Sequence, residues 1–164
     1  MSEDLRAAAT AVLDVCRARG LKIVTAESCT GGLVAGALTD IAGSSAVLDR
    51  GFVTYSNNAK HEVLGVPVAT IEQHGAVSRE TAEAMARGAL ACAGVDLAIA
   101  ITGIAGPGGG SKDKPVGLVH FAAVARKGTL VHQEKRYGDL GRSAVRRASV
   151  LQALAMLRDL AQTR

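Results

Sequence analysis

The sequence predicts a single three-layer α/β/α domain with a mixed, mainly parallel sheet and a C-terminal β-hairpin followed by a helix. Helical and β-rich segments alternate along the chain, an order that places helices on both faces of a sheet. Residues 96–102 are almost wholly apolar, as expected of a central strand covered on both faces. One domain typically has roughly 100 to 200 residues. We therefore expect residues 1–164 to form one domain.

The first third of the chain predicts a helix, a strand and a second helix. Ser2 precedes two acidic residues, a pattern typical of a helix N-terminus, and Gly20 ends the helical spacing of apolar residues. Residues 21–26 are β-rich, and residues 27–30 form a sharp turn. Small residues predict a helix over residues 31–39. The segment is therefore a strand-turn-helix unit.

The middle of the chain predicts a second strand and two more helices. Residues 51–55 are β-rich, and Ser56 is a candidate cap for a short helix. Ser78 precedes a longer helical segment, residues 79–93, and Gly94 ends it. Helices and strands thus continue to alternate as far as the apolar strand.

The last third predicts a loop, a hairpin and a helix. Residues 103–110 are too rich in glycine and too many for a simple turn. Residues 116–125 and 129–136 are β-rich around a lysine-glycine turn, so they predict a β-hairpin. Apolar residues at helical spacing predict a final helix over residues 142–161.

Composition excludes several classes of protein. Apolar residues make up 48% and charged residues 21% of the chain, which is typical of a folded globular protein. With two Tyr, two Phe and no Trp, the chain has few aromatic rings on which bases could stack. The net charge of +4 is scattered, and we interpret its one cluster, Arg142, Arg146 and Arg147, as a solvated helix face. We therefore expect no nucleic-acid partner.

Cysteine usage and hydropathy bear on location. The three cysteines have no CxxC spacing, and the first residues lead into an Ala-rich helix rather than a signal peptide. No apolar run approaches the ~20 residues that cross a bilayer. We expect a cytoplasmic protein without a membrane partner. The Ala-rich helices also predict flat faces that pair subunits in a homo-oligomer.

Sites in open α/β sheets form at the carboxyl ends of strands. Three loops should meet there, over residues 27–32, 55–60 and 102–110. In the first loop, Ser28 has two open interpretations, a helix cap or a nucleophile whose oxyanion is held by backbone N–H groups. The two glycines that follow favour the second, because they let a ligand approach the backbone. Cys29 is a rival nucleophile with no His partner nearby in the sequence.

A serine nucleophile needs a base. Lys60 is a candidate if burial keeps it neutral, and is otherwise a surface charge. Tyr55 either packs in the core or offers its hydroxyl to the site. Neither metal-ligand spacing nor a phosphate-loop or dinucleotide motif is present, so we expect no metal and no cofactor. The histidines follow no recognisable triad order, and we interpret them as structural or exposed: His61, His74, His120 and His132.

Six ordered strings resemble the CinA C-terminal domain family. They are TAESCTGG (25–32), GSS (43–45), YSNNAK (55–60), GAVS (75–78), TGIAGP (102–107) and KPVG (114–117). The resemblance extends from about residue 5 to residue 160, and the family includes stand-alone nicotinamide-nucleotide amidases. It implies a three-layer α/β domain that hydrolyses nicotinamide mononucleotide to nicotinate mononucleotide and ammonia, in pyridine-nucleotide recycling.

The resemblance also implies residue roles. The family is described as serine/lysine amidohydrolases, which implies Ser28 as nucleophile, Lys60 as general base and Tyr55 as the tyrosine of the same motif. We expect backbone N–H groups of residues 29–31 to form an oxyanion hole and residues 102–106 to contact ribose or phosphate. The complete set of expected substrate-binding residues is Cys29, Thr30, Gly31, Gly32, Ser45, Thr102, Gly103, Gly106 and Arg142.

The chain departs from the family pattern in one respect. Family members tend to have a Gly-Asp-Arg string before the last helix, whereas two extra residues separate Asp139 from Arg142 here. Arg142 could still reach a substrate phosphate by a bidentate contact. Larger members have an additional N-terminal domain, for which 164 residues leave no room, so we expect its activity to be absent. The alternative function is a catalytically silent nucleotide-binding domain associated with competence or DNA damage.

Overall fold

The computed structural model describes residues 1–163. Among these residues, no helix combines the length and the apolar character needed to cross a membrane. The elements in chain order are α1 (Glu3–Arg19), β1 (Ile23–Glu27), α2 (Leu33–Thr39), the 3₁₀ helix η1 (Ser44–Ala46), β2 (Leu48–Val53), α3 (Asn57–Leu64), α4 (Val68–His74), α5 (Arg79–Ala93), β3 (Leu97–Gly103), β4 (Leu118–Ala125), β5 (Leu130–Arg136) and α6 (Arg142–Gln162).

The strands form one mixed sheet. Their order is β2-β1-β3-β4-β5. β1 pairs in parallel with β2 and β3, whereas β3 with β4 and β4 with β5 pair antiparallel. This arrangement confirms the mixed sheet with its central apolar strand and the C-terminal hairpin.

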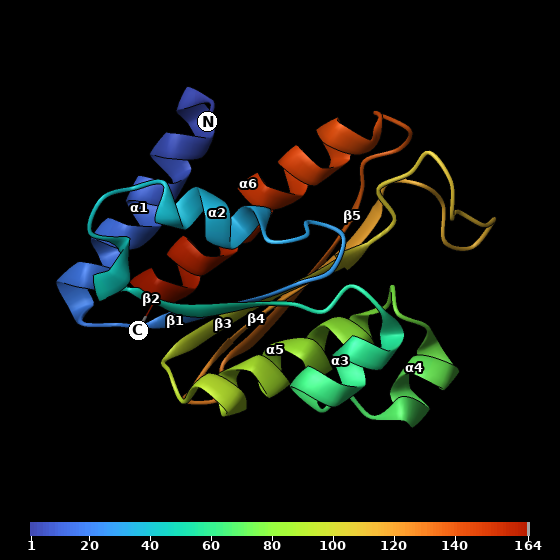
Figure 1. Cartoon of the computed structure of the whole chain (residues 1–164), viewed down its shortest axis with the longest axis horizontal. Coiled ribbons are helices and arrows are strands. Elements are labelled where there is room, and N and C mark those ends of the chain that lie inside the picture. Colours follow the sequence, from blue (N-terminus) through green and yellow to red (C-terminus); the bar gives the residue numbers. More distant parts are fainter. Residues whose placement is uncertain (164) are drawn as a thin grey trace.

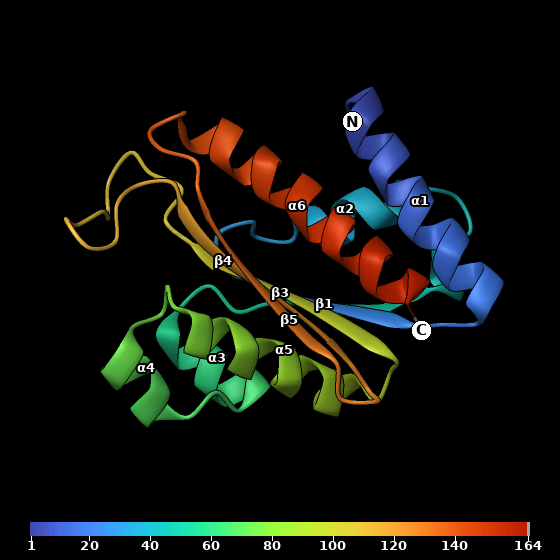
Figure 2. The same ribbon diagram turned by 180° about the vertical axis from the view of Figure 1, so that it is seen from behind.

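Helices cover both faces of the sheet. α1, α2 and α6 lie on one face, and α3, α4 and α5 lie on the other (Figures 1 and 2). Successive residues of β3 point to opposite faces, so Leu97 and Ile99 pack in one buried cluster with α1 and α6, while Ala98 and Ala100 pack in a second with α5. The predicted α/β/α fold class is therefore confirmed.

Most elements follow the sequence patterns, but η1 was not predicted and β2 spans Leu48–Val53 rather than residues 51–55. The Ser2 hydroxyl makes no capping bond to α1 and instead donates to the Asp4 carboxylate at 2.7 Å. Ser56 and Ser78 do cap α3 and α5 as expected. Helix α4 was not predicted, because none of its residues is buried and the segment has no apolar periodicity to detect.

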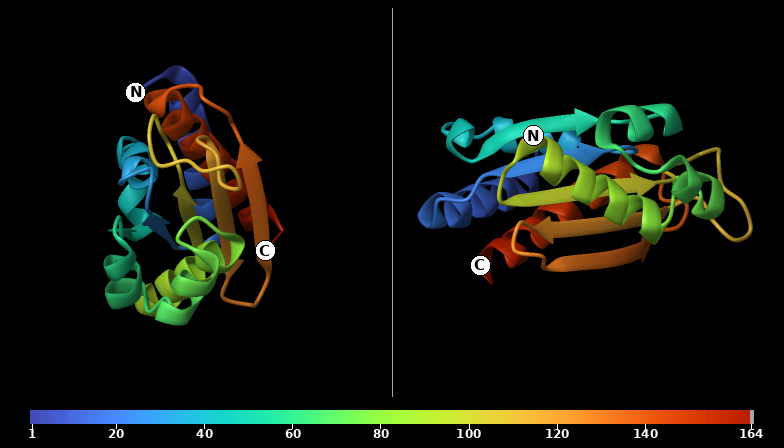
Figure 3. Two further views of the ribbon diagram at one scale, coloured as in Figure 1. Left: turned by 90° about the vertical axis from the view of Figure 1, so that its right-hand side faces the viewer. Right: turned by 90° about the horizontal axis from the view of Figure 1, so that it is seen from below.

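The parallel strands bring the predicted loops to one edge of the sheet. Glu27 at the end of β1 pairs with Ile101 near the end of β3, and also with Val53 at the end of β2. The chain leaves all three strands at the same edge, and the glycine-rich loop extends beyond it (Figure 3). The loops after β1, β2 and β3 therefore meet there, as the sequence predicts.

Candidate active site

Ser28 begins the loop that follows β1. Its N–H donates to the carbonyl oxygen of Ile101 at 2.9 Å, which fixes it against the end of β3. Gly31 and Gly32, with φ of 58° and 100°, then turn the chain into α2, and such angles suit glycine. Gly32 is the N-cap of α2, so Ser28 does not cap that helix.

Lys60 lies on α3, and its side-chain amine reaches Ser28. Only 1% of the lysine is exposed. Its Nζ lies 2.9 Å from Ser28 Oγ, 2.9 Å from the Thr54 carbonyl oxygen and 3.2 Å from the Tyr55 carbonyl oxygen. Burial lowers the pKa of Lys60 to about 8. About a tenth of the amine is therefore neutral at pH 7.

The three neighbours of the Lys60 amine suit its neutral form. A neutral amine has two N–H groups and one lone pair. The carbonyl oxygens of Thr54 and Tyr55 accept the two N–H groups, which leaves the lone pair for the Ser28 hydroxyl. The ammonium form donates to the same three oxygens. Lys60 can therefore accept the proton of Ser28 and keep its position in both protonation states.

Ser28 and Lys60 lie in a cavity of about 270 Å³. The walls come from the three predicted loops, from the segment before α5 and from the start of α6. Of the other predicted site residues, six line the cavity: Cys29, Tyr55, Thr102, Gly103, Gly106 and Arg142. Asn57, on the first turn of α3, also lines it and was not predicted.

Arg142 connects two walls of the cavity. Its Nη2 donates to Tyr55 Oη at 3.0 Å, and its Nη1 donates to the carbonyl oxygen of Gly106 at 2.9 Å. Tyr55 is 60% exposed, so it does not pack in the core. The two extra residues before Arg142 therefore do not move its guanidinium away from the site.

Thr102 fixes the wall formed by the glycine-rich loop. Its hydroxyl is almost fully buried and donates to the Ala76 carbonyl oxygen at 2.8 Å. A Cβ atom at Gly106 would lie 2.5 Å from Val116 Cγ1, and this glycine also has a φ of 85°. Glycine is therefore required at position 106, because the two ends of the loop approach each other closely there.

Four predicted binding residues do not line the cavity. Thr30 is fully buried, Gly31 donates its N–H to the Ser28 carbonyl oxygen at 3.0 Å, and Gly32 caps α2. Ser45 lies in η1, just before the amino end of β2, whereas Ser28 follows the carboxyl end of the parallel strand β1. The structure thus corrects the expectation for Ser45, which lies at the opposite edge of the sheet.

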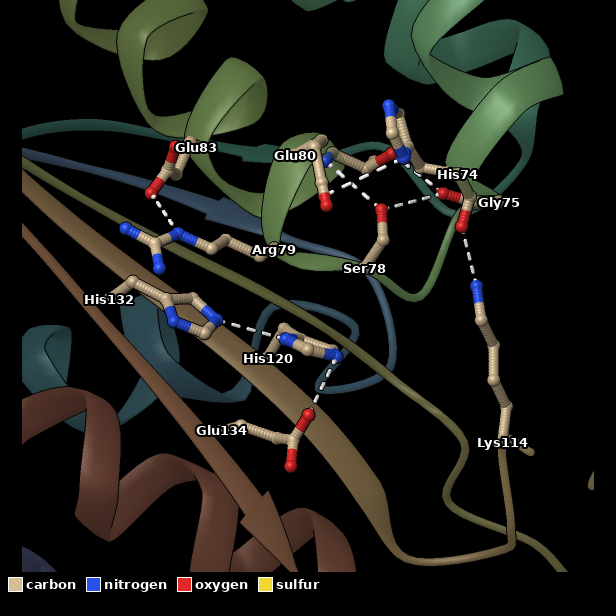
Figure 4. A network of polar contacts seen from close by, with 11 residues as sticks. His74, Gly75, Ser78, Arg79, Glu80, Glu83, Lys114, His120, His132 and Glu134 are labelled. Carbon is tan, nitrogen blue, oxygen red and sulfur yellow. Dashed lines mark hydrogen bonds and ion pairs between the residues drawn. The ribbon is translucent and has the colours of Figure 1, made fainter.

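Cys29 and the histidine pair of β4 and β5 are less suited to catalysis than Ser28 and Lys60. Burial raises the pKa of the Cys29 thiol to about 12, so it stays protonated. His120 Nδ1 and His132 Nε2 lie 2.9 Å apart on β4 and β5 (Figure 4). Their cavity contains neither Ser28 nor Lys60. Within residues 1–163, no group of three His, Cys, Asp or Glu side chains is arranged to hold a metal ion.

Two charged residues that the sequence did not assign to the site hold the Ser28 loop. The Glu27 carboxylate is fully buried and accepts the Thr30 hydroxyl at 2.7 Å. Arg146, expected on a solvated helix face, donates from Nε to the Cys29 carbonyl oxygen at 3.1 Å. An acid at the end of a buried strand, just before a helix, is a signal that could have identified Glu27. Arg146 offers no such signal, because its contact depends on how α6 packs.

The chain is similar to one family over nearly its whole length. The CinA C-terminal domain family matches residues 5–161. A nicotinamide-nucleotide amidohydrolase PncC of Enterobacter agglomerans is 52% identical over 145 residues, covering 87% of each chain. The protein of the same name from Escherichia coli K12 is 55% identical over 142 residues, covering 86% of this chain and 85% of the other.

Other relatives are longer or have different names. A CinA-like protein of Geobacter sulfurreducens is 52% identical over 149 residues, which are 91% of this chain but only 36% of that protein. The solved structure of the competence/damage inducible protein CihA from Agrobacterium tumefaciens is 56% identical and superposes with a TM-score of 0.96, covering 98% and 97% of the two chains.

Proposed function

The chain belongs to the CinA C-terminal domain family, and on this premise we propose that it is an amidohydrolase that converts nicotinamide mononucleotide to nicotinate mononucleotide and ammonia, as a single domain. The observation that carries the proposal is the 2.9 Å contact between the buried Lys60 amine and the Ser28 hydroxyl. The substrate class comes from relatives of similar length that are named nicotinamide-nucleotide amidohydrolases.

The first half-reaction forms an acyl-enzyme. Neutral Lys60 takes the proton of the Ser28 hydroxyl as Oγ attacks the carboxamide carbon. A tetrahedral intermediate forms with the charge on the former carbonyl oxygen. Its collapse breaks the C–N bond, and the Lys60 ammonium gives its proton to the nitrogen that leaves as ammonia. The nicotinoyl group is then an ester of Ser28, and Lys60 is neutral again.

The second half-reaction hydrolyses the ester. Lys60 accepts a proton from a water molecule as the water attacks the ester carbon. The second tetrahedral intermediate expels Ser28 Oγ, which takes a proton back from Lys60. The product is the nicotinate nucleotide, and the enzyme returns to its first state. One amine therefore serves both steps, which matches its contacts with Ser28 and two fixed carbonyl oxygens.

The oxyanion requires N–H donors near Ser28. Gly31 N–H is occupied by the Ser28 carbonyl oxygen. Cys29 and Thr30 follow Ser28 directly, and within residues 1–163 neither N–H group donates to a backbone acceptor. Cys29 lines the cavity, whereas Thr30 is fully buried, so we assign the oxyanion hole to the Cys29 N–H.

The remaining cavity residues are assigned to substrate binding. Arg142 has a planar guanidinium suited to a phosphate. Its N–H groups now donate to Tyr55 Oη and to the Gly106 carbonyl oxygen, and they would donate to phosphate oxygens instead when the substrate binds. The backbone of residues 102–106 would contact the ribose. Asn57 offers an amide to the carboxamide end of the substrate.

Two further properties remain proposals. We place the protein in the cytoplasm, where pyridine nucleotides are recycled and where its three free cysteines stay reduced. We also retain the proposal of a homo-oligomer formed through the Ala-rich helices.

The second candidate is a silent nucleotide-binding domain, because several proteins of similar structure are named after competence or damage rather than a reaction. Ammonia release from nicotinamide mononucleotide by the purified chain separates the two. We expect turnover that is lost in Ser28→Ala and Lys60→Ala while nucleotide binding is retained, with Ser45→Ala as the matched serine control. Full ammonia release by Ser28→Ala would refute the mechanism, and binding without turnover in the parent chain would favour the silent domain.

A further inference from the structure

A guanidinium group supports the Ser28 loop from the side that faces away from the active cavity. Arg146, on the second turn of α6, donates from Nε to the Cys29 carbonyl oxygen at 3.1 Å and from Nη2 to the Thr30 carbonyl oxygen at 3.3 Å. Arg146 does not line the cavity that contains Ser28 and Lys60. It lines a separate cavity of about 410 Å³ between α1, α2 and α6.

The shape of the guanidinium matches these two acceptors. Nε–H and one Nη–H lie parallel along one edge of the planar group, so they can bind two neighbouring carbonyl oxygens together. A lysine ammonium is a point charge on a flexible chain and would not fix both. The pair of contacts therefore determines the orientation of the loop as well as its distance from α6.

Holding the Cys29 carbonyl oxygen also sets the direction of an N–H group. The Cys29 N–H and the Cys29 C=O flank one Cα atom, and the peptide units on both sides are planar, so fixing the carbonyl limits the rotations that set the direction of the N–H. Arg146 therefore restrains the N–H of Cys29, a residue that lines the cavity of Ser28 and Lys60.

The same loop is held from within the fold by Glu27. Its Oε1 accepts the Thr30 hydroxyl at 2.7 Å and the Val34 N–H at 2.9 Å, and its Oε2 accepts the Ala35 N–H at 3.0 Å. Thr30 thus has its side chain bound to a buried carboxylate and its carbonyl oxygen bound to Arg146. Rotation of the Cys29–Thr30 peptide would break the Arg146 contacts while Glu27 kept the rest of the loop in place.

We propose that Arg146 is a positioning residue for catalysis, which holds Cys29 so that the Cys29 N–H stabilises the oxyanion. This inference rests on the proposed acyl-enzyme mechanism. Arg146 does not line the cavity that contains Ser28 and Lys60, so we expect its loss to act on the transition state and not on nucleotide binding. The expected signature is a lower kcat with an almost unchanged KM.

The experiment compares Arg146→Ala and Arg146→Lys with Arg147→Ala. Arg147 is the next residue of α6 and pairs with Asp4 on the exposed surface, so its removal is the matched control. Loss of one oxyanion donor costs about 10²–10³ in kcat. Because the N–H is misdirected rather than removed, we expect kcat of Arg146→Ala to fall by about 10- to 100-fold with KM within about twofold. Arg146→Lys should recover little of this loss, and Arg147→Ala should resemble the parent.

Chemical rescue distinguishes positioning from general damage to the fold. Arg146 lines an open cavity, so millimolar guanidinium ion can occupy the space that Arg146→Ala leaves. We expect guanidinium to restore part of the lost kcat in Arg146→Ala and to leave the parent unchanged. An unchanged kcat in Arg146→Ala, a loss expressed mainly in KM, or no rescue by guanidinium would overturn the proposal.

A substrate-independent probe separates this proposal from the proposed function. A fluorophosphonate reacts with an activated serine and places a developing negative oxygen in the oxyanion hole. If the parent chain is labelled at Ser28 but releases no ammonia, the substrate assignment fails. In that case slower labelling of Arg146→Ala than of Arg147→Ala supports the positioning role, and equal rates refute it. Absence of labelling in the parent refutes both proposals.

Discussion

The Lys60 amine is bound to the Ser28 hydroxyl at 2.9 Å, at the end of a side chain that the fold buries almost completely. Its other polar neighbours are two backbone carbonyl oxygens. Burial without a carboxylate partner lowers the pKa of the lysine to about 8. Burial of the Lys60 amine therefore costs folding free energy, and the same burial keeps part of the amine neutral near neutral pH.

The activity should rise with pH as Lys60 loses its proton. We expect kcat/KM for nicotinamide mononucleotide to increase about tenfold per pH unit below the Lys60 pKa of about 8, and to level off above it. A pH–rate profile between about pH 6 and pH 9.5 measures this. Lys60→Arg keeps the positive charge but not the titration, so it should remain nearly inactive throughout. A flat profile in the parent would contradict the assignment of Lys60 as base.

Protein stability should also depend on Lys60 at alkaline pH. The pKa of Lys60 falls from 10.5 to about 8 on folding, so between these values the folded state binds fewer protons than the unfolded state. The free energy of unfolding then rises with pH across this window, as the cost of burying the charge disappears. Urea denaturation at about pH 8 and pH 10 should show this rise in the parent and in Lys112→Met, an exposed control, but a smaller one in Lys60→Met.

Local order in the sequence was enough to predict that the three loops meet, whereas the roles of Ser28 and Lys60 came from the family resemblance. Parallel strands bring the loops after them to one edge, so a serine after β1 and a lysine after β2 can meet without further information. Tyr55 and Arg142 could also be assigned to the site from strings near this edge.

Residues whose contacts depend on packing could not be assigned in this way. Arg146 meets the loop 117 positions earlier in the chain only because α6 lies across that face of the sheet. Ser45 shows the opposite error, since it shares a family string with the site but precedes the amino end of β2. That a residue belongs to a family string does not show at which end of the strands the residue lies.

Thiol reagents should not inhibit the enzyme through Cys29. Burial raises the pKa of its thiol to about 12, so almost no thiolate exists near neutral pH. Cys92 is exposed and should be the cysteine that iodoacetamide modifies. We expect mass spectrometry to find label on Cys92 with ammonia release retained. Stoichiometric alkylation of Cys29 that abolishes activity would make the thiol, and not Ser28, the stronger candidate nucleophile.

Arg142 should discriminate between substrates with and without a phosphate. Charge-assisted hydrogen bonds contribute about 1.5–3 kcal/mol each, so Arg142→Ala should raise KM for nicotinamide mononucleotide by about 10- to 100-fold. KM for nicotinamide riboside, which lacks the phosphate, should change little. Steady-state kinetics with both compounds measure this difference, and Arg136→Ala, an exposed arginine on β5, serves as control. Equal effects on both substrates would place the phosphate elsewhere.

The Glu27 carboxylate should be more important for folding than any exposed acid. Both of its oxygens accept N–H or O–H donors inside the fold, and the residue is fully buried. Glu27→Gln keeps the shape but turns one acceptor into an NH₂ group, which faces a backbone N–H donor and leaves it unpaired. An unsatisfied buried donor costs about 1–3 kcal/mol, and we expect a loss of this size in urea denaturation. Glu72→Gln, on the exposed surface of α4, should change the free energy of unfolding by less than about 0.5 kcal/mol. A Glu27→Gln protein as stable as this control would show that the loop does not depend on the carboxylate.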